Sequence, residues 1–152
     1  MGVIKLDFTV AAPAEHVWSF GLQADKIPEW QFDVVAVKGI SGPIDRKGTK
    51  YILVYKKAGI YLNSPVEVSR FEPENLTVET TGKTPLGGYF KSCTMMRSIN
   101  EHMTRVDWIM DYKLPGWVFG ILMDRLLFEW AFRKTVQIYN KNFKLLAEKT
   151  YL

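Results

Sequence analysis

The chain opens with a regular alternation of apolar and polar residues. The apolar positions are Ile4, Leu6, Phe8 and Val10. A period of two is typical of a β-strand with one face on a core and the other in water. Two short helices are expected next. The first begins after Ala12-Pro13, since proline suits the start of a helix, and the second covers 24–30, where Pro28 limits its length.

Residues 33 to 114 read as strands and turns. Six further strands are expected at Val34–Lys38, Thr49–Lys56, Ile60–Phe71, Leu76–Thr81, Gly88–Ile99 and Thr104–Leu114. Turn-forming sequences such as Ser41-Gly42-Pro43 and Lys57-Ala58-Gly59 separate them at hairpin spacing. Because short links join antiparallel neighbours, we expect one seven-stranded antiparallel sheet with one apolar face.

After Pro115-Gly116 the pattern becomes helical and continues to about Lys149, a span of roughly 50 Å at 1.5 Å per residue. One apolar stripe should face the sheet along the whole helix: Trp117, Ile121, Phe128, Phe132, Tyr139, Phe143 and Leu146. Polar residues oppose its second half: Gln137, Asn140, Lys141, Lys144 and Glu148. The predicted fold is α+β, a single domain over residues 1–152 in which a curved sheet grips the long C-terminal helix.

A second apolar stripe opposes the first half of this helix, where water-facing residues are expected. It consists of Phe119, Leu122, Met123, Leu126 and Trp130. Three interpretations stay open: burial under the loop Lys83–Gly88, a homodimer surface, or transient contact with a membrane surface. Burial by a loop or a subunit ranks above membrane contact, because Asp124 and Glu129 interrupt the stripe.

Composition narrows the class of protein. The 152 residues are 47% hydrophobic, which excludes a disordered chain, and the net charge of +4 comes without the dense basic blocks of a nucleic-acid-binding tail. The single cysteine, Cys93, excludes an internal disulfide. No secretory signal pattern opens the chain, so we expect a cytoplasmic protein. Two isolated histidines, His16 and His102, predict neither a metal site nor a general base, and no cofactor is expected.

Several short segments resemble the helix-grip superfamily, which includes the birch pollen allergen fold, START-type lipid-transfer domains and polyketide cyclases. They are Ala12-Pro13-Ala14-Glu15-His16-Val17-Trp18, Ile27-Pro28-Glu29-Trp30, Gly48-Thr49, Phe71-Glu72-Pro73, Thr104-Arg105-Val106 and the ending Asn142-Phe143-Lys144-Leu145-Leu146-Ala147-Glu148. The resemblance covers nearly the whole chain. It implies a cavity between the sheet and the last helix that takes up a hydrophobic small molecule or lipid. It does not imply one activity, because this architecture hosts carriers, cyclases and receptors.

Candidate ligand-binding residues are those whose pattern directs them between sheet and helix. The strands contribute Tyr51, Leu53, Tyr55, Trp108, Met110 and Tyr112, and the helix contributes Arg125, Phe128 and Phe132. The alternative for the rings is simple core packing. Arg125 requires a carboxylate or a ligand anion unless its guanidinium reaches solvent at the helix edge. The strand around Cys93 has two open registers, one with Cys93, Met95 and Arg97 inward and one with Thr94, Met96 and Ser98 inward.

Function is expected to be the binding or transport of a hydrophobic small molecule or lipid. Catalytic residues cannot be assigned, because no nucleophile and base occur together. One alternative is a polyketide cyclase or dehydratase in which Tyr51, Tyr112, Arg97 or Arg125 stabilises an enolate. The other is a protein-interaction module that uses the second apolar stripe.

Overall fold

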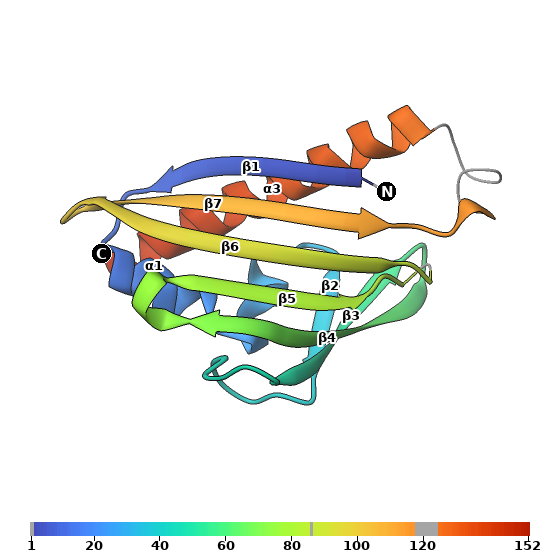
Figure 1. Ribbon diagram of the computed structural model, residues 1–152, viewed down its shortest axis with the longest axis horizontal. Coiled ribbons are helices and arrows are strands. Elements are labelled where there is room, and N and C mark those ends of the chain that lie inside the picture. Colours follow the sequence, from blue (N-terminus) through green and yellow to red (C-terminus); the bar gives the residue numbers. More distant parts are fainter. Residues whose placement is uncertain (1, 86, 118–124) are drawn as a thin grey trace.

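A computed structural model describes residues 2–85, 87–117 and 125–152, the last range without the side chain of Arg125. Its seven strands form one antiparallel sheet in the order β1-β7-β6-β5-β4-β3-β2 (Figure 1). The strands are β1 (Gly2–Val10), β2 (Val34–Lys38), β3 (Lys50–Lys57), β4 (Ile60–Glu72), β5 (Thr77–Lys83), β6 (Tyr89–Asn100) and β7 (Met103–Lys113). The helices are α1 (Ala14–Gly21), η1 (Ala24–Glu29), η2 (Pro73–Asn75) and α3 (Arg125–Tyr151). The predicted fold class is therefore confirmed.

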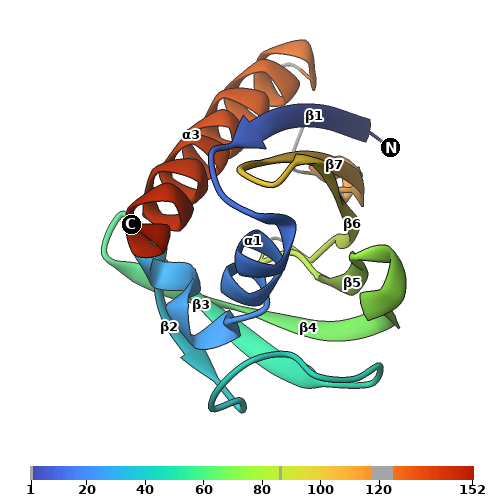
Figure 2. The same ribbon diagram turned by 90° about the vertical axis from the view of Figure 1, so that its left-hand side faces the viewer.

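The sheet is built from consecutive hairpins except where the chain returns to its start. β1 pairs with β7, with Leu6 opposite Trp108, while β2 to β7 each pair with their sequence neighbours. The intervening helices α1 and η1 carry the chain from β1 at one edge to β2 at the other. Figure 2 shows the sheet curving around α1, with α3 on the same concave side. The interior of the protein therefore lies between the concave face of the sheet and the helices.

The register of β6 settles which of its side chains face that interior. Met96 is 6% exposed, whereas Met95 is 36% exposed and Arg97 is exposed. Thr94, two residues from Met96, lies on the same face because strand side chains alternate. Thr94 and Met96 therefore point inward, and Cys93 and Arg97 belong to the outer face.

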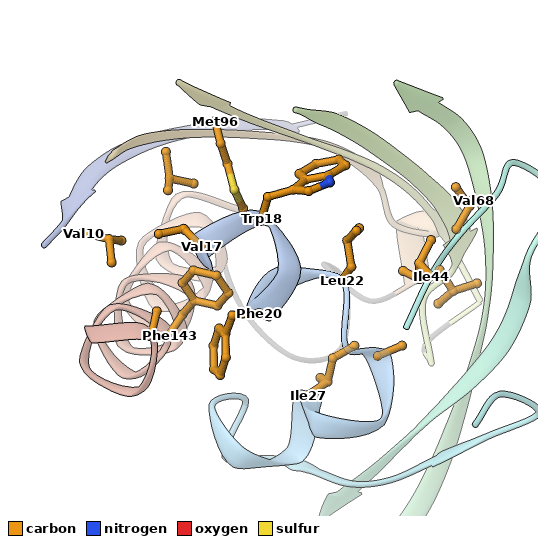
Figure 3. Close-up of a cluster of buried hydrophobic side chains, with 14 of the residues drawn as sticks. Val10, Val17, Trp18, Phe20, Leu22, Ile27, Ile44, Val68, Met96 and Phe143 are labelled. Atoms are coloured by element: carbon orange, nitrogen blue, oxygen red, sulfur yellow. The ribbon is translucent and has the colours of Figure 1, made fainter. Parts of the chain in front are cut away.

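The core is centred on α1 and the second half of α3 (Figure 3). The ring of Phe143 meets the rings of Phe20 at 5.1 Å, Trp30 at 5.3 Å and Phe8 at 6.1 Å, all edge to face. Such pairs add about 0.5–1.5 kcal/mol each to the gain from burial. Near the end of α3, Nε2 of His16 donates a hydrogen bond to the carbonyl oxygen of Ala147 at 2.9 Å. These contacts fix the end of α3 against α1.

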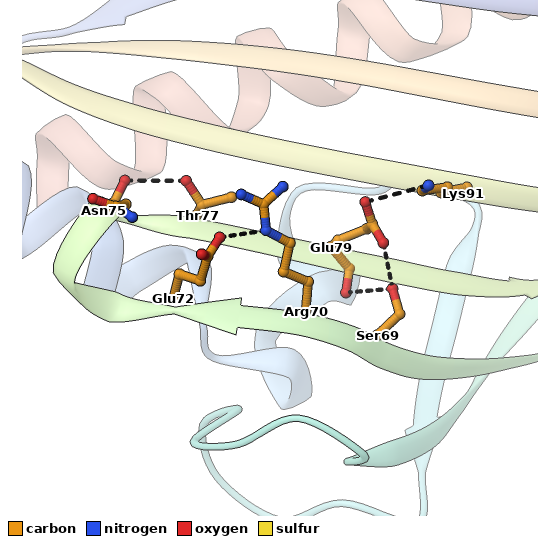
Figure 4. A network of polar contacts seen from close by, with 7 residues as sticks. All are labelled: Ser69, Arg70, Glu72, Asn75, Thr77, Glu79 and Lys91. Atoms are coloured by element: carbon orange, nitrogen blue, oxygen red, sulfur yellow. Dashed lines mark hydrogen bonds and ion pairs between the residues drawn. The ribbon is translucent and has the colours of Figure 1, made fainter.

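The outer face of β4, β5 and β6 carries a network of charged and polar side chains (Figure 4). The hydroxyl of Ser69 donates to Oε1 of Glu79 at 2.8 Å, and Nζ of Lys91 lies 3.6 Å from the other carboxylate oxygen. Partial burial and the charge of Glu79 raise the pKa of the nearby Cys93 thiol. Cys93 is therefore held as a thiol rather than as a reactive thiolate.

Candidate functional site

A cavity of about 100 Å³ lies between the inner face of the sheet, α1, the segment after η1 and α3. Its lining is dominated by aromatic and aliphatic side chains, which suits an apolar ligand. The apolar lining residues are Phe8, Trp18, Leu22, Trp30, Val78, Met96, Val106, Trp108, Val136 and Phe143. Gly21 completes the wall at α1, where an added Cβ would lie 3.1 Å from Cε of Met96.

Four polar side chains interrupt this lining: Gln31, Thr94, Tyr139 and Asn140. Three of them come from one wall, formed by the segment after η1 and one turn of α3, and Thr94 faces them from β6. All four are neutral. Among the described residues, no Lys, Arg, Asp or Glu lines the cavity. Asn140 was expected on the solvent side of the helix, and that expectation is wrong because α3 meets the segment after η1 on this side as well.

A buried carboxylate stands beside this polar wall. Asp33 is 7% exposed, and Tyr139 donates its hydroxyl to Oδ1 of Asp33. Nζ of Lys57 lies 2.9 Å from Oδ2, with the lysine side chain 55% exposed. A buried carboxylate is costly unless it is paired and hydrogen-bonded, and both oxygens of Asp33 are engaged. The backbone holds the residue in place, because the carbonyl oxygen of Asp33 accepts a hydrogen bond from the amide of Lys56 at 3.0 Å.

Three phenols around Asp33 and the inner sheet are held in their neutral form. Burial and the adjacent Asp33 carboxylate raise the pKa of Tyr139 far above its ordinary value. Burial, followed by the charge of Asp33, raises the pKa of Tyr55, and burial alone raises that of Tyr51. These side chains can therefore form hydrogen bonds at neutral pH, but they do not supply a phenolate.

The residues predicted to bind a ligand do not all lie at one place in the structure. Trp108 lines the cavity. Tyr112, Phe128 and Phe132 form a separate aromatic cluster between β7 and the first half of α3. In that cluster the ring of Tyr112 lies 5.3 Å from Phe132 and 6.1 Å from Phe128, and the two phenylalanines stack at 5.8 Å.

The remaining candidates lie on the sheet, except Arg125, whose side chain is not among those described. Tyr51 and Leu53 on β3 are each 6% exposed and belong to the core. Tyr55 packs against that core and, like Met110, is partly exposed. The side chain of Arg125 lies outside the described residues, so its direction is not assigned.

Asp33 and Gln31 were missed by reasoning from the sequence. An Asp between Trp30-Gln31-Phe32 and a strand has the pattern of an ordinary turn residue. The one available signal was Tyr139, placed on the sheet-facing stripe, because a buried phenol normally has a hydrogen-bond partner. The identity of that partner, 106 residues away, was not accessible from spacing.

The first half of α3 is much more exposed than its second half. Leu126 is 75% exposed and Trp130 is 60% exposed, so within the described residues the loop Lys83–Gly88 does not cover them. Nζ of Lys134 lies 5.9 Å above the ring of Trp130. Trp117, expected to face the sheet, is 52% exposed. Phe119, Leu122 and Met123 of the same predicted stripe lie outside the described residues.

Two further kinds of feature are absent from the described part of the chain. No three side chains of His, Cys, Asp or Glu gather there into a group able to hold a metal ion. None of its helices is long and apolar enough to cross a bilayer.

Solved structures share this architecture over almost the full chain. A protein from Thermus thermophilus matches with a TM-score of 0.80 and 16% identity, covering 99% of this chain and 100% of the other. The Zhui aromatase/cyclase from Streptomyces matches with a TM-score of 0.79 and 16% identity, covering 97% and 94%. A START superfamily protein from Mycobacterium smegmatis matches with a TM-score of 0.76 and 13% identity, covering 97% and 98%.

At these identities the structural matches demonstrate a shared fold and nothing about activity. Among curated protein sequences, none matches this chain. A family model does match, over residues 1–148 of the 152. The chain therefore belongs to the family described as polyketide cyclase / dehydrase and lipid transport, within the helix-grip superfamily.

Proposed function

We propose that this protein binds a hydrophobic small molecule in the cavity between the sheet and α3. The observation that carries the proposal is the lining, in which three tryptophans and other apolar side chains surround four neutral polar groups. Apolar walls supply affinity and a few polar groups supply orientation, which is the usual composition of a small-molecule site. The family also includes carriers of this kind by its description, lipid transport.

The size of the cavity limits what it accepts in this conformation. Its volume is about 100 Å³, whereas a cavity of about 150 Å³ accommodates benzene and the pockets of drug-sized ligands measure about 300–1,000 Å³. Even a small single ring needs more room than this, but it exceeds the cavity least and is therefore the first ligand to test. A ring ligand requires the wall formed by α3 and the segment after η1 to move outward slightly, and a longer acyl chain or a fused polycycle requires a larger movement. That wall is joined through side chains, such as Asn142 Nδ2 donating to the Trp30 carbonyl at 3.3 Å, and not through a sheet ladder.

A screen of single-ring and fused-ring aromatics and of short fatty acids, read by thermal shift and native mass spectrometry, tests this proposal. Thr94→Leu adds volume inside the cavity and should abolish binding, because the added atoms occupy the space of a ring. Ser98→Leu is the matched control: Ser98 is exposed on the same strand and does not line the cavity. Equal binding by both variants, or no response from the unaltered protein, would contradict the proposal.

Polyketide cyclase-type catalysis is the second candidate. It is favoured by Tyr139, a cavity-lining phenol hydrogen-bonded to the buried carboxylate of Asp33. Of the residues expected to stabilise an enolate, Tyr51 is buried with a raised pKa and Arg97 is exposed on the outer face. Incubation with a poly-β-ketone thioester, followed by mass spectrometry, should show loss of water through cyclisation. Product formation that is unchanged in Tyr139→Phe would exclude a role for this pair.

The exposed half of α3 supports a separate proposal, a contact surface between two copies of the chain. Leu126 and Trp130 present large apolar side chains to solvent, and interface cores are enriched in aromatic residues. The alternative is that the same surface of α3 contacts a membrane. Sedimentation distinguishes the two when it is run with and without anionic vesicles.

A further inference from the structure

We infer that Tyr139 is a hydrogen-bond acceptor for the cavity ligand, and that the ligand therefore carries a neutral donor, a hydroxyl or an N–H group. This inference rests on the proposed function, since it concerns the chemistry of the same cavity. Tyr139 lines the cavity and donates its hydroxyl hydrogen to Oδ1 of Asp33. Gln31, Thr94 and Asn140 also line the cavity, but each of them can both donate and accept a hydrogen bond.

The direction of this hydrogen bond decides what Tyr139 can offer. A phenol has one O–H hydrogen and also accepts through its oxygen. Because the hydrogen is directed to a carboxylate, and charge-assisted hydrogen bonds are about twice as strong as neutral ones, it is not available to a ligand. The oxygen is left with acceptor capacity only. A ligand hydroxyl can donate to it, while a ligand ether or ketone oxygen cannot use it.

Lys57 keeps Asp33 in this role. Its Nζ lies 2.9 Å from Oδ2, so the carboxylate has one oxygen directed to Lys57 and the other to Tyr139. The side chain of Asp33 is 6% exposed, which leaves the carboxylate little access to water as an alternative partner. Asp33 is thus a positioning residue that acts on the ligand through Tyr139.

The neutral lining at this wall favours a neutral ligand over an anionic one. The Asp33 carboxylate that holds Tyr139 is paired with Lys57, and within the described part of the chain no cationic side chain lines the cavity. A ligand carboxylate or phosphate carries no donor for the Tyr139 oxygen, and no cation in the described lining offsets the cost of removing its charge from water. Gln31 and Asn140, on the same wall, can donate and accept, so they accommodate a hydroxyl without adding charge.

Three single-ring probes of similar size separate these possibilities. p-Cresol donates a hydrogen bond, 4-methylanisole only accepts one, and p-xylene does neither. Binding is followed through the indole N–H resonances of the ¹⁵N-labelled protein, since Trp18, Trp30 and Trp108 line the cavity. We expect the unaltered protein to bind p-cresol about three- to tenfold more tightly than 4-methylanisole, the range of one hydrogen bond.

Two variants test the roles of the residues. Tyr139→Phe should remove the preference for p-cresol while p-xylene binding remains. Asp33→Ala frees the phenolic hydrogen, so Tyr139 can donate, and the affinity for 4-methylanisole should rise relative to p-cresol. A purely structural role of Asp33 would weaken all three probes together. Tyr151→Phe, the same change at an exposed position of the same helix, should keep the preference of the unaltered protein.

Thermal melting of each variant confirms that the chain is folded before binding is compared. Two results would overturn the inference and leave the proposed function intact. One is a preference for p-cresol that survives in Tyr139→Phe. The other is equal binding of p-cresol and 4-methylanisole by the unaltered protein. If none of the three probes shifts the indole resonances of the unaltered protein, the proposed function fails at this cavity and the inference fails with it.

Discussion

The two halves of α3 lie in different surroundings although both are rich in large apolar residues. In the second half Val136, Phe143 and Ala147 are 2%, 6% and 0% exposed, whereas in the first half Leu126, Leu127 and Trp130 are 75%, 52% and 60% exposed. Figure 1 shows the first turns of α3 extending past the edge strand β1, while the later turns lie beside α1. The same kind of helix surface is thus core in one place and open surface in the other.

The difference arises from what the rest of the chain places opposite each half. The second half meets α1 and the segment after η1, which contribute Phe20, Trp30 and His16. The first half meets β7 through the Tyr112, Phe128 and Phe132 cluster. A helix with apolar residues around more than one face needs two partners to bury them, and the described chain provides two only for the second half.

The largest expected effect is in the second half. Phe143→Ala removes a ring that contacts three other rings and should lower the free energy of unfolding by about 3–5 kcal/mol. Leu145→Ala, two residues away at a position 53% exposed, should change it by less than about 0.5 kcal/mol. Urea unfolding of both variants measures the contrast. Similar losses would show that the second half is not anchored through Phe143.

A smaller, pH-dependent effect is expected at Glu148, near the end of the same half. The backbone N–H of Ala11, at 3.0 Å from Oε1, and then Lys144 lower the pKa of Glu148 from its ordinary value of 4.5. Because the pKa in the folded state is the lower one, this carboxylate stabilises the fold fully above pH 4.5, and the contribution is lost as the pH falls through the folded-state value.

Glu148→Gln removes this contribution, so the variant should be less stable than the unaltered protein at pH 7 and approach it below pH 4.5. The side chain is 26% exposed, and solvent screening keeps the difference below about 1 kcal/mol. Thermal melts across the acid range measure it. A difference that stays constant with pH would contradict the assignment.

The smallest effect on stability is expected in the first half. The double change Leu126→Glu and Trp130→Glu places charges at two exposed positions and should leave the free energy of unfolding within about 1 kcal/mol. Its effect should instead appear in association, as a lower sedimentation mass if two copies meet here, or as lost binding to anionic vesicles. A large loss of stability would mean that both side chains are buried in the folded protein.

Much of the fold was predictable because it depends on local patterns. Alternating residues such as Ile4, Leu6 and Val10 predicted β1, and each predicted strand boundary lies within a few residues of the observed one. Turn chemistry between strands predicted antiparallel pairing. The position of Phe143 on the sheet-facing stripe also agrees with its burial at 6% exposure. These features follow from periodicity within one element.

The candidate site was only partly predictable, because its residues come from distant segments. Trp108 was expected to face the interior and does line the cavity. The sequence pattern allowed two registers for β6, and Thr94 pointed inward in only one of them. A shift of one residue reverses the face of every side chain in a strand. Asn140 was placed on the wrong side, because helix periodicity does not indicate that a second segment packs there.

The amino-acid pattern by itself determined the order of strands and helices and the alternation of inner and outer side chains, since these depend on neighbours a few residues apart. Only the tertiary structure decided which half of α3 is buried, and that Asp33 meets Tyr139 and Lys57. The reason is physical. A buried charge is tolerated only where partners from remote segments converge on it, and that convergence is a property of the folded chain.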